Sequence, residues 1–167
     1  MKDNPVLSAI LKRRSIRKYK TKHISDASIE TILEAGRWAP SGLNNQPWRF
    51  SVIKDKAVKE KLAECTESSA IILECDMAIG VFYNLSDGYN RDKDIMSIGA
   101  CIQNMMLAAK SLSIGSVWLG EILNKKKRVN EIIGAGDKNE LMAVIAFGFP
   151  DEKPKINRRS LDSIILS

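Results

Sequence analysis

Apolar side chains recur every three or four positions in five stretches of the chain, a spacing that predicts amphipathic helices. The first helix is predicted to begin at Asn4 and Pro5, because asparagine caps helices and proline suits the first helical position. The second is predicted to begin at Ser25 or Asp26 and to end before Pro40. Both starts are defined by capping chemistry as well as by apolar spacing.

Three more helices are predicted at residues 56–65, 93–113 and 125–133, and Gly134 closes the last of them. The helix at residues 93–113 is apolar over much of its circumference. We therefore expect it to be a central helix or to face a partner subunit. Residues 69–74 fit either a helix or a strand.

Four shorter runs have the length and composition of strands: residues 50–53, 77–83, 116–119 and 141–148. The run at 77–83 is nearly all apolar, which predicts a strand buried on both faces. After the last strand, residues 151–160 are polar and basic, whereas residues 161–166 are largely apolar. We expect this apolar end to dock on another surface.

The chain has 167 residues, which is typical of one domain, and we treat 1–167 as a single domain. Its hydrophobic and charged fractions, 44% and 28%, are those of a soluble globular protein. The longest apolar region, residues 95–112, is interrupted by polar residues, so no membrane span is predicted. No secretory signal is recognisable at the N-terminus.

Cys65, Cys75 and Cys101 are odd in number and lack CxxC spacing, so neither a disulfide framework nor a zinc site is indicated. Reduced thiols in a cytoplasmic protein are the expectation. The single histidine, His23, lies in a polar basic stretch that is typical of a solvated surface. Few residues are thus available for metal-assisted hydrolysis or for Ser-His or Cys-His catalysis.

A net charge of +6 favours an anionic partner. Nucleic acid would fit this charge, but acidic residues are interspersed with the basic ones throughout. The densest basic run, residues 125–128, starts a predicted helix and is explained by a solvated helix face. We expect no nucleic-acid partner.

Arginines gather at residues 13–17, here called the arginine segment, where the first helix gives way to an extended stretch. Arg13, Arg14 and Arg17 offer forked charged donors, and Ser15 adds a hydroxyl, as binding of a phosphate dianion requires. The alternative is a solvated helix end, where arginines also suit the helix dipole. A second basic pair, Arg158 and Arg159, could meet the same phosphate if the tail folds back.

Residues 39–50 form a stretch rich in amides, here called the polar loop, between a predicted helix and a predicted strand. Asn44 and Gln46 each carry a donor and an acceptor, which suits the edge of a planar heterocycle. Pro47 and Trp48 could wall an apolar ring. The alternative is an ordinary connection, because proline, glycine, serine and asparagine also favour turns.

Taken together, the chain resembles the nitroreductase family of FMN-dependent oxidoreductases over essentially its whole length. The motifs that carry the resemblance are Arg13-Arg14-Ser15-Ile16-Arg17, Ala39-Pro40-Ser41 with Asn44, Gln46-Pro47-Trp48 and Phe50, Ser97-Ile98-Gly99-Ala100, Ser116-Val117-Trp118-Leu119-Gly120, Ala146-Phe147-Gly148-Phe149-Pro150 and Arg158-Arg159. Each motif is weak alone, but their order along the chain is specific.

The resemblance implies an α+β fold with a central, mostly antiparallel sheet flanked by helices, in an intertwined homodimer with two FMN sites at its interface. It implies that the arginine segment and the basic C-terminal pair hold phosphate and ribityl groups, that Asn44 meets the pyrimidine edge, and that a backbone N–H near Gly120 or Glu121 faces flavin N5. The residues expected at the cofactor are Arg13, Arg14, Ser15, Arg17, Pro40, Ser41, Asn44, Gln46, Gly120, Glu121, Arg158 and Arg159.

The reaction implied by the resemblance is hydride transfer from NADH or NADPH through FMN to a small-molecule electron acceptor such as a nitroaromatic or a quinone, in a ping-pong cycle. No catalytic side chain is required. Residues 84–95 connect a strand directly to the long helix, leaving no room for the helical insertion that caps the site in larger members. The alternative is a protein that binds or sequesters flavin with little turnover.

Overall fold

The computed structural model describes residues 4–155 and 157–166. Within them the helices are α1 (Pro5–Lys12), α2 (Asp26–Arg37), α3 (Lys56–Ala63), α4 (Ser69–Glu74), α5 (Arg91–Ser111) and α6 (Lys126–Ile133). The strands are β1 (Trp48–Ile53), β2 (Met77–Asn84), β3 (Gly115–Leu119) and β4 (Asn139–Gly148). Short 3-10 turns, η1 (Gly42–Asn44), η2 (Glu121–Lys125) and η3 (Leu161–Ile164), complete the list.

The four strands form one antiparallel sheet in the order β1-β2-β4-β3, which confirms the predicted fold class. β2 and β4 are central, and almost all of their residues are buried, as the apolar runs predicted. All four predicted strands are present, although β1 begins two residues earlier, at Trp48, and β4 begins at Asn139. The ambiguous stretch at residues 69–74 is helical.

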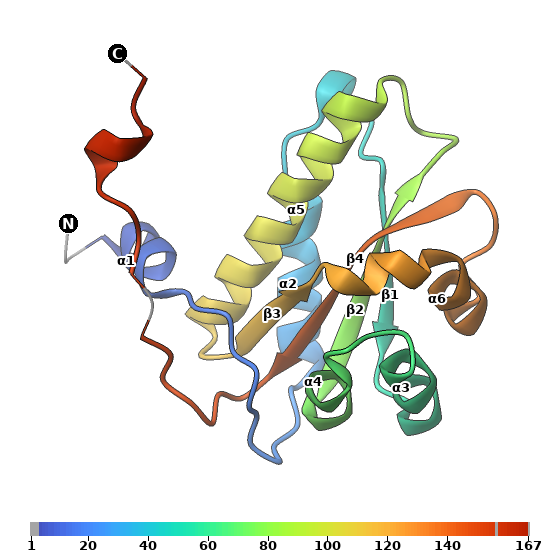
Figure 1. Cartoon of the computed structure of the whole chain (residues 1–167). Helices are drawn as coiled ribbons and strands as arrows, with labels where there is room; N and C mark the ends of the chain where they lie inside the picture. The colour runs from blue at the N-terminus through green and yellow to red at the C-terminus, as the bar shows by residue number, and fades with distance from the viewer. Residues whose placement is uncertain (1–3, 156, 167) are drawn as a thin grey trace.

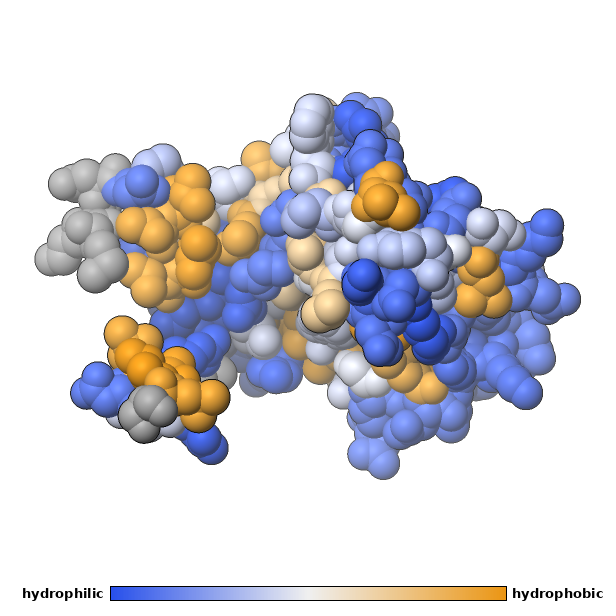
Figure 2. Space-filling model, turned by 90° about the horizontal axis from the view of Figure 1, so that it is seen from above, coloured by the Kyte–Doolittle hydropathy of each residue, from blue (hydrophilic) through white to orange (hydrophobic). Residues whose placement is uncertain are grey.

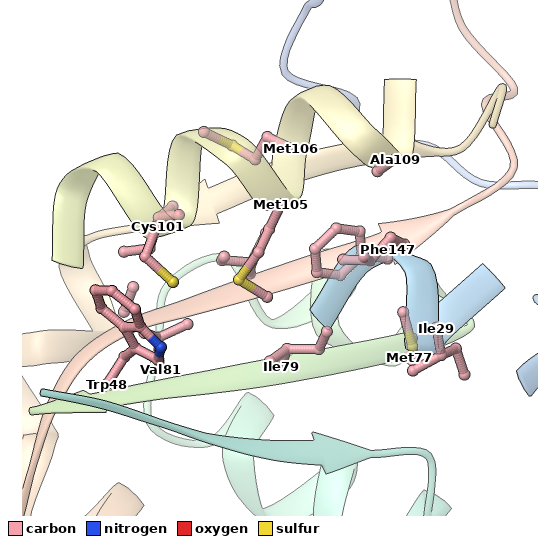
Figure 3. Close-up of a cluster of buried hydrophobic side chains, with 14 of the residues drawn as sticks. Ile29, Trp48, Met77, Ile79, Val81, Cys101, Met105, Met106, Ala109 and Phe147 are labelled. Carbon is pink, nitrogen blue, oxygen red and sulfur yellow. The ribbon is translucent and has the colours of Figure 1, made fainter. Parts of the chain in front are cut away.

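Helices cover both faces of the sheet (Figure 1). α2 and α5 pack on one face, and their side chains enclose a core with Ile79 and Phe147 from the strands (Figure 3). α3, α4 and α6 cover the other face around a second buried cluster. α2 and α5 approach closely at Gly36, where an added Cβ would lie 2.7 Å from Met105 Cγ. The predicted central position of the long helix is confirmed.

The predicted caps are present. The Asn4 side chain accepts from the N–H groups of Val6 and Leu7, and the Ser25 side chain accepts from the Ser28 N–H. Gly134 ends α6 with φ of 70°, a left-handed conformation that glycine adopts without steric cost. These local signals therefore define the ends of three helices.

α1 and the C-terminal tail project from the body at its left side in Figure 1, and both carry exposed apolar side chains. α1 exposes Val6 and Leu11 by 63% and 56%, and Leu166 at the end of the tail is exposed by 98%. Seen from above, these arms carry much of the apolar surface at that side (Figure 2). Within one chain, the expected docking of the apolar tail is therefore not seen for its described residues.

Candidate functional site

The arginine segment lies beside the edge strand β3. α1 ends at Lys12, and Arg13 already has extended backbone angles. Ser15 forms a parallel bridge with Ser116, and the Ile16 N–H donates to the Ser116 carbonyl at 3.0 Å. The sheet thus fixes the backbone from which the arginine side chains project.

The start of the C-terminal tail runs along the same segment. The Lys20 N–H donates to the Phe149 carbonyl at 2.9 Å, and the Asp151 N–H donates to the Lys18 carbonyl at 3.0 Å. One step farther, a Glu152 carboxylate oxygen accepts from the backbone N–H groups of Arg17 and Lys18. Sequence reasoning missed Glu152, which bonds to backbone rather than to the arginine side chains.

Positive charge accumulates at Arg13 without compensation. Burial, followed by the charges of Arg158 and Arg14, lowers the pKa of Arg13 below its ordinary value. Among the described residues Arg13 forms no ion pair. The structure therefore brings Arg158 of the tail to the arginine segment of the same chain, and the group is suited to an anion.

A cavity of about 710 Å³ lies at this place, between the arginine segment, the C-terminal end of α5 and the tail. Arg13, Arg14, Lys110 and Glu152 are among its lining residues, whereas Ser15 and Arg17 are not. The Arg14 guanidinium donates to two carbonyls close in sequence, at 2.7 Å each, so it is partly engaged. Arg13 is the arginine of the segment that is most free to bind a ligand there.

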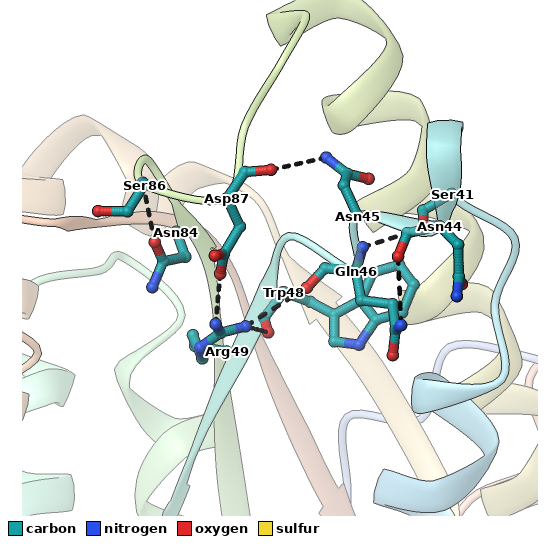
Figure 4. Close-up of polar contacts among 9 residues, drawn as sticks. All are labelled: Ser41, Asn44, Asn45, Gln46, Trp48, Arg49, Asn84, Ser86 and Asp87. Atoms are coloured by element: carbon teal, nitrogen blue, oxygen red, sulfur yellow. Dashed lines mark hydrogen bonds and ion pairs between the residues drawn. The ribbon is translucent and has the colours of Figure 1, made fainter.

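The polar loop has an unusual backbone. Leu43, Asn44 and Gln46 have φ angles of 55°, 56° and 47°, in the left-handed region that side chains other than glycine rarely adopt. The loop folds on itself, because the Gln46 N–H donates to Ser41 Oγ at 3.0 Å and Gln46 Nε2 donates to the Asn44 carbonyl at 3.2 Å (Figure 4). Ser41 and Gln46, both predicted site residues, therefore brace the loop.

Asn45, which sequence reasoning did not single out, ties the loop to its surroundings. Its side-chain Nδ2 donates to the Asp87 carbonyl at 2.9 Å and to Asp94 Oδ1 at 2.7 Å. The ion pair between Arg49 and Asp87 adds a second connection to the loop after β2 (Figure 4). Trp48, which the sequence suggested as a wall for an apolar ring, is instead buried in the core, where it anchors the start of β1.

Asp94 is a fully buried carboxylate in the first turn of α5. Its Oδ2 accepts from the Tyr83 hydroxyl at 3.0 Å, the Tyr89 N–H at 3.0 Å and the Asn90 N–H at 3.1 Å. Burial alone would raise the pKa of Asp94, but the hydrogen bonds, led by that from Asn45, outweigh it and hold the pKa below its ordinary value. The only sequence signal was an acidic residue in a helix's first turn, which the helix dipole already explains.

Gly120 lies immediately after β3, at the end opposite the arginine segment. A Cβ added to Gly120 would meet no atom within 4 Å, so space is open beside it. The neighbouring Glu121 side chain is occupied, since its carboxylate accepts from Thr66 Oγ1 at 2.6 Å and from the Glu67 N–H at 3.1 Å. Only the backbone at this position is available to a ligand.

Apart from Gly120 and Glu121 after β3, the predicted site residues belong to segments at opposite ends of α5 (Figure 1). The polar loop meets Asp94, whereas the cavity beside the arginine segment is lined by Lys110. These two positions on one helix are 16 residues apart, which corresponds to about 24 Å of helix axis. A single chain therefore does not bring its arginine segment and its polar loop together.

No helix among the described residues is long and apolar enough to cross a membrane. In the same part of the chain, no three acidic, cysteine or histidine side chains gather as metal ligands. His23 is exposed, and its Nδ1 lies 2.7 Å from an Asp76 carboxylate oxygen.

Comparison with known proteins gives a consistent answer. The sequence model described as "Nitroreductase family" matches residues 10–74 and 70–149. A protein of Archaeoglobus fulgidus provisionally described as an NADH dehydrogenase/NAD(P)H nitroreductase is 36% identical over 151 residues, which cover 88% of this chain and 87% of the relative. The NADPH-flavin oxidoreductase of Vibrio harveyi is 27% identical over 168 residues, covering 93% of this chain and 70% of the relative.

A solved structure agrees with this fold. A Desulfovibrio desulfuricans protein provisionally described as a nitroreductase, crystallised in complex with FMN, has a TM-score of 0.96 and 42% sequence identity. The match covers 99% of this chain and 97% of the other. The order of motifs, the antiparallel sheet and the family match agree, and the chain belongs to the nitroreductase family.

Proposed function

We propose that this protein is an FMN-dependent oxidoreductase, which passes hydride from NADH or NADPH through flavin N5 to a small acceptor in a ping-pong cycle. The observation that carries the proposal is the uncompensated positive group of Arg13 and Arg158 at one end of β3, with open space beside Gly120 at its other end. A flavin mononucleotide has a phosphate at one end and a ring system at the other, which matches this arrangement.

The residues present fit the phosphate end of FMN. Like charges close together raise the free energy of the empty site, and a phosphate dianion relieves this repulsion while accepting forked hydrogen bonds. Arg13 and Arg158 are the residues best placed for it. Ser15, Arg17 and Arg159 stay in the proposal as supporting donors from the same two segments.

The distances fit the ring end as well. Ser116, paired with Ser15, lies four residues before Gly120, or about 13 Å along a strand. That span is within the length of one flavin mononucleotide, whereas the separation of about 24 Å along α5 is not. We therefore propose that the polar loop lining each flavin, with Pro40, Ser41 and Asn44, comes from a second copy of the chain. The exposed apolar faces of α1 and the tail support such a homodimer.

FMN, when bound, supplies the hydride chemistry at its N5. The chain would hold the phosphate with the arginines, present a backbone N–H near Gly120 or Glu121 to the ring, and wall the ring with the polar loop. Positioning alone is sufficient for this role, because the redox chemistry belongs to the cofactor. The three buried thiols play no part in it, and their reduced state suits the cytoplasmic location that we expect.

The acceptor is proposed to be a small molecule such as a nitroaromatic or a quinone. The short connection from β2 to α5, residues 85–90, bears Tyr89 beside the polar loop and no covering helix. An open site of this kind suits flat acceptors of varied outline. Neither nicotinamide is favoured by the chain, so both donors enter the test.

Absorbance of the purified protein tests the proposal. After incubation with FMN and gel filtration, the protein should be yellow, should bleach without oxygen on addition of NADH or NADPH, and should recover its colour when 1,4-benzoquinone is added. A protein that stays colourless would refute FMN binding. A yellow protein that neither donor bleaches would instead support the alternative of a flavin-binding or sequestering protein.

A further inference from the structure

The polar loop is held by the carboxylate of Asp94, which is not among the residues expected at the cofactor. Asp94 bonds to Asn45 in the loop, to Tyr83 in β2 and to the backbone at Tyr89 and Asn90. Asp94 is fully buried, and both of its carboxylate oxygens accept hydrogen bonds: Oδ1 from Asn45, and Oδ2 from the other three donors. A buried charge with so many donors is costly to rearrange, so the geometry around it is rigid.

Asn45 has its orientation dictated by this carboxylate. Its Nδ2 donates to Asp94 and to the Asp87 carbonyl, while its Oδ1 is buried with no hydrogen-bond partner among the described residues. An amide whose acceptor is unsatisfied keeps its place only because its donor is strongly bound. The Asn45 side chain therefore transmits the position of Asp94 to the loop backbone.

The backbone on either side of Asn45 needs such support. Asn44 and Gln46 both have positive φ, and Leu43, also left-handed, is 85% exposed and cannot be held there by its own packing. Conformations of this kind persist where surrounding contacts determine them. The bonds from Ser41 and Gln46 act within the loop, whereas Asn45 is the member anchored to α5.

The same carboxylate also places Tyr89. Its backbone N–H is bound to Asp94, and its ring lies against the loop at Gly42, where an added Cβ would clash with the tyrosine hydroxyl. Tyr89 is 44% exposed, so the residue also borders solvent. Asp94 thereby sets two elements against each other, the polar loop and the aromatic ring that covers it.

We propose that Asp94 is the positioning residue of the polar loop, acting through Asn45 and Tyr89 on the geometry in which the flavin ring and the acceptor meet. The proposal rests on the proposed function, because it assigns the loop to the flavin ring. Asp94 is fully buried among protein donors, so it would act through these residues and not by contact with the cofactor or the acceptor. Its effect is expected in the rate of transfer rather than in the binding of the phosphate, which the arginine segment of the other copy of the chain would hold.

Three variants test this: Asp94→Asn, Asn45→Ala and the double variant, with Asp92→Asn as the matched control. Asp92 is in the same helical turn and loses the same charge, but it is exposed. Asn45→Ala leaves the Tyr83, Tyr89 and Asn90 donors on Asp94 and is expected to fold even if Asp94→Asn does not. Each protein is loaded with FMN, reduced with NADH or NADPH and mixed with 1,4-benzoquinone in a stopped-flow instrument.

We expect the rate constant for reoxidation, per bound flavin, to fall about tenfold or more in Asn45→Ala and in Asp94→Asn, because small misplacements of reacting groups have effects of this size. The double variant should be no slower than Asp94→Asn, since both changes break one connection. Asp92→Asn should match the wild type. FMN affinity should change much less than the rate.

A lower melting temperature with an unchanged rate per bound flavin in Asn45→Ala would mean that the contact is merely structural and would overturn the proposal. A double variant whose loss of rate equals the product of the two single fold-losses would also overturn it, because the two residues would then act independently. Failure of the proposed function looks different, because the wild-type protein itself would then stay colourless or resist reduction by both donors.

Discussion

The two halves of the candidate site are held in opposite ways. The polar loop is complete within one chain: its strained backbone is bound by Ser41, Asn45 and the buried carboxylate of Asp94. The arginine segment is incomplete, because Arg13 faces the like charges of Arg14 and Arg158. The side chains of one half are held by hydrogen bonds within the chain, whereas in the other half the sheet fixes only the backbone and Arg13 forms no ion pair among the described residues.

This difference fits the tasks proposed for the two halves. A phosphate is bound by charge, and several arginines tolerate small changes in its position. A reacting ring must be held within a fraction of an ångström, so its wall has to be rigid beforehand. Changes at the arginine segment should therefore alter affinity, whereas changes around the polar loop should alter stability and rate.

The largest effect is expected from Arg13→Ala. Loss of a charged hydrogen bond to the phosphate should weaken FMN binding by about 1.5–3 kcal/mol, measured by titrating the fluorescence of free FMN. The stability of the protein without FMN should not fall, because Arg13 forms no ion pair among the described residues and lies near two like charges, those of Arg158 and Arg14. Arg17→Ala tests the supporting donor in the same way.

Arg128→Ala is the control for Arg13→Ala, since Arg128 is an exposed arginine on α6 whose partner is Glu131 at 3.2 Å. It should leave FMN affinity unchanged. Equal affinities of the Arg13→Ala variant and the wild type would remove Arg13 from the phosphate site and with it the contrast between the two halves.

A smaller effect, on stability, is expected from Tyr83→Phe. This change removes one of the donors to the buried Asp94 carboxylate and should destabilise the fold by about 1 kcal/mol, near the lower end for such losses because other donors remain. Urea unfolding measures it. Tyr89→Phe, at an exposed tyrosine, is the matched control and should stay within about 0.5 kcal/mol of the wild type.

The contribution of Asp94 to the stability of the polar-loop half should depend on pH only under acidic conditions. The folded-state pKa of Asp94 lies below the ordinary value of 3.8. Its stabilising contribution is therefore complete above that value and is lost as the pH falls through the lower, folded-state pKa. The difference in unfolding free energy between wild type and Asp94→Asn should be constant near neutrality and shrink only at strongly acidic pH. A difference that shrinks already between pH 7 and 5 would contradict the lowered pKa.

Local sequence signals were sufficient for most of the fold. Asn4, Ser25 and Gly134 define helix ends by their own chemistry, and the length and apolar composition of the runs in β2 and β4 favoured the buried strands that the structure has. The resemblance supplied the antiparallel sheet flanked by helices, which pattern alone does not give, whereas the strand order β1-β2-β4-β3 came from the structure. Residues 69–74 stayed ambiguous because a short apolar run fits helix and strand equally well.

The site was predictable only in part, for a physical reason. Arg13 and Ser15 stand in a recognisable motif, but Asn45 and Asp94 act through a contact between residues 49 positions apart. Nothing in the neighbourhood of either residue marks that contact. Asn44 and Asn45 are the same residue type in sequence. Only the backbone geometry of the loop exposes Asn44 and directs Asn45 toward Asp94.

The smallest effect on the folding of the chain itself is expected from Ile10→Ser on α1. Ile10 is 46% exposed, and α1 has no buried residue within one chain. Unfolding extrapolated to low protein concentration should therefore change by no more than about 0.5 kcal/mol. If α1 packs against a second copy, the variant should instead weaken the dimer, seen as a lower unfolding midpoint than that of the wild type at high protein concentration and as more monomer in sedimentation.

Leu85→Ser is the control for Ile10→Ser, because Leu85 is 48% exposed but lies in the loop after β2, far along the chain from α1. A loss of several kcal/mol in Ile10→Ser at every concentration would mean that α1 is already packed in the single chain. An unchanged monomer fraction would remove α1 from the proposed dimer interface. The expected result would extend the contrast between the halves. The packing of α1, which leads into the arginine segment, would then require a second copy of the chain, whereas the polar loop is held within one chain.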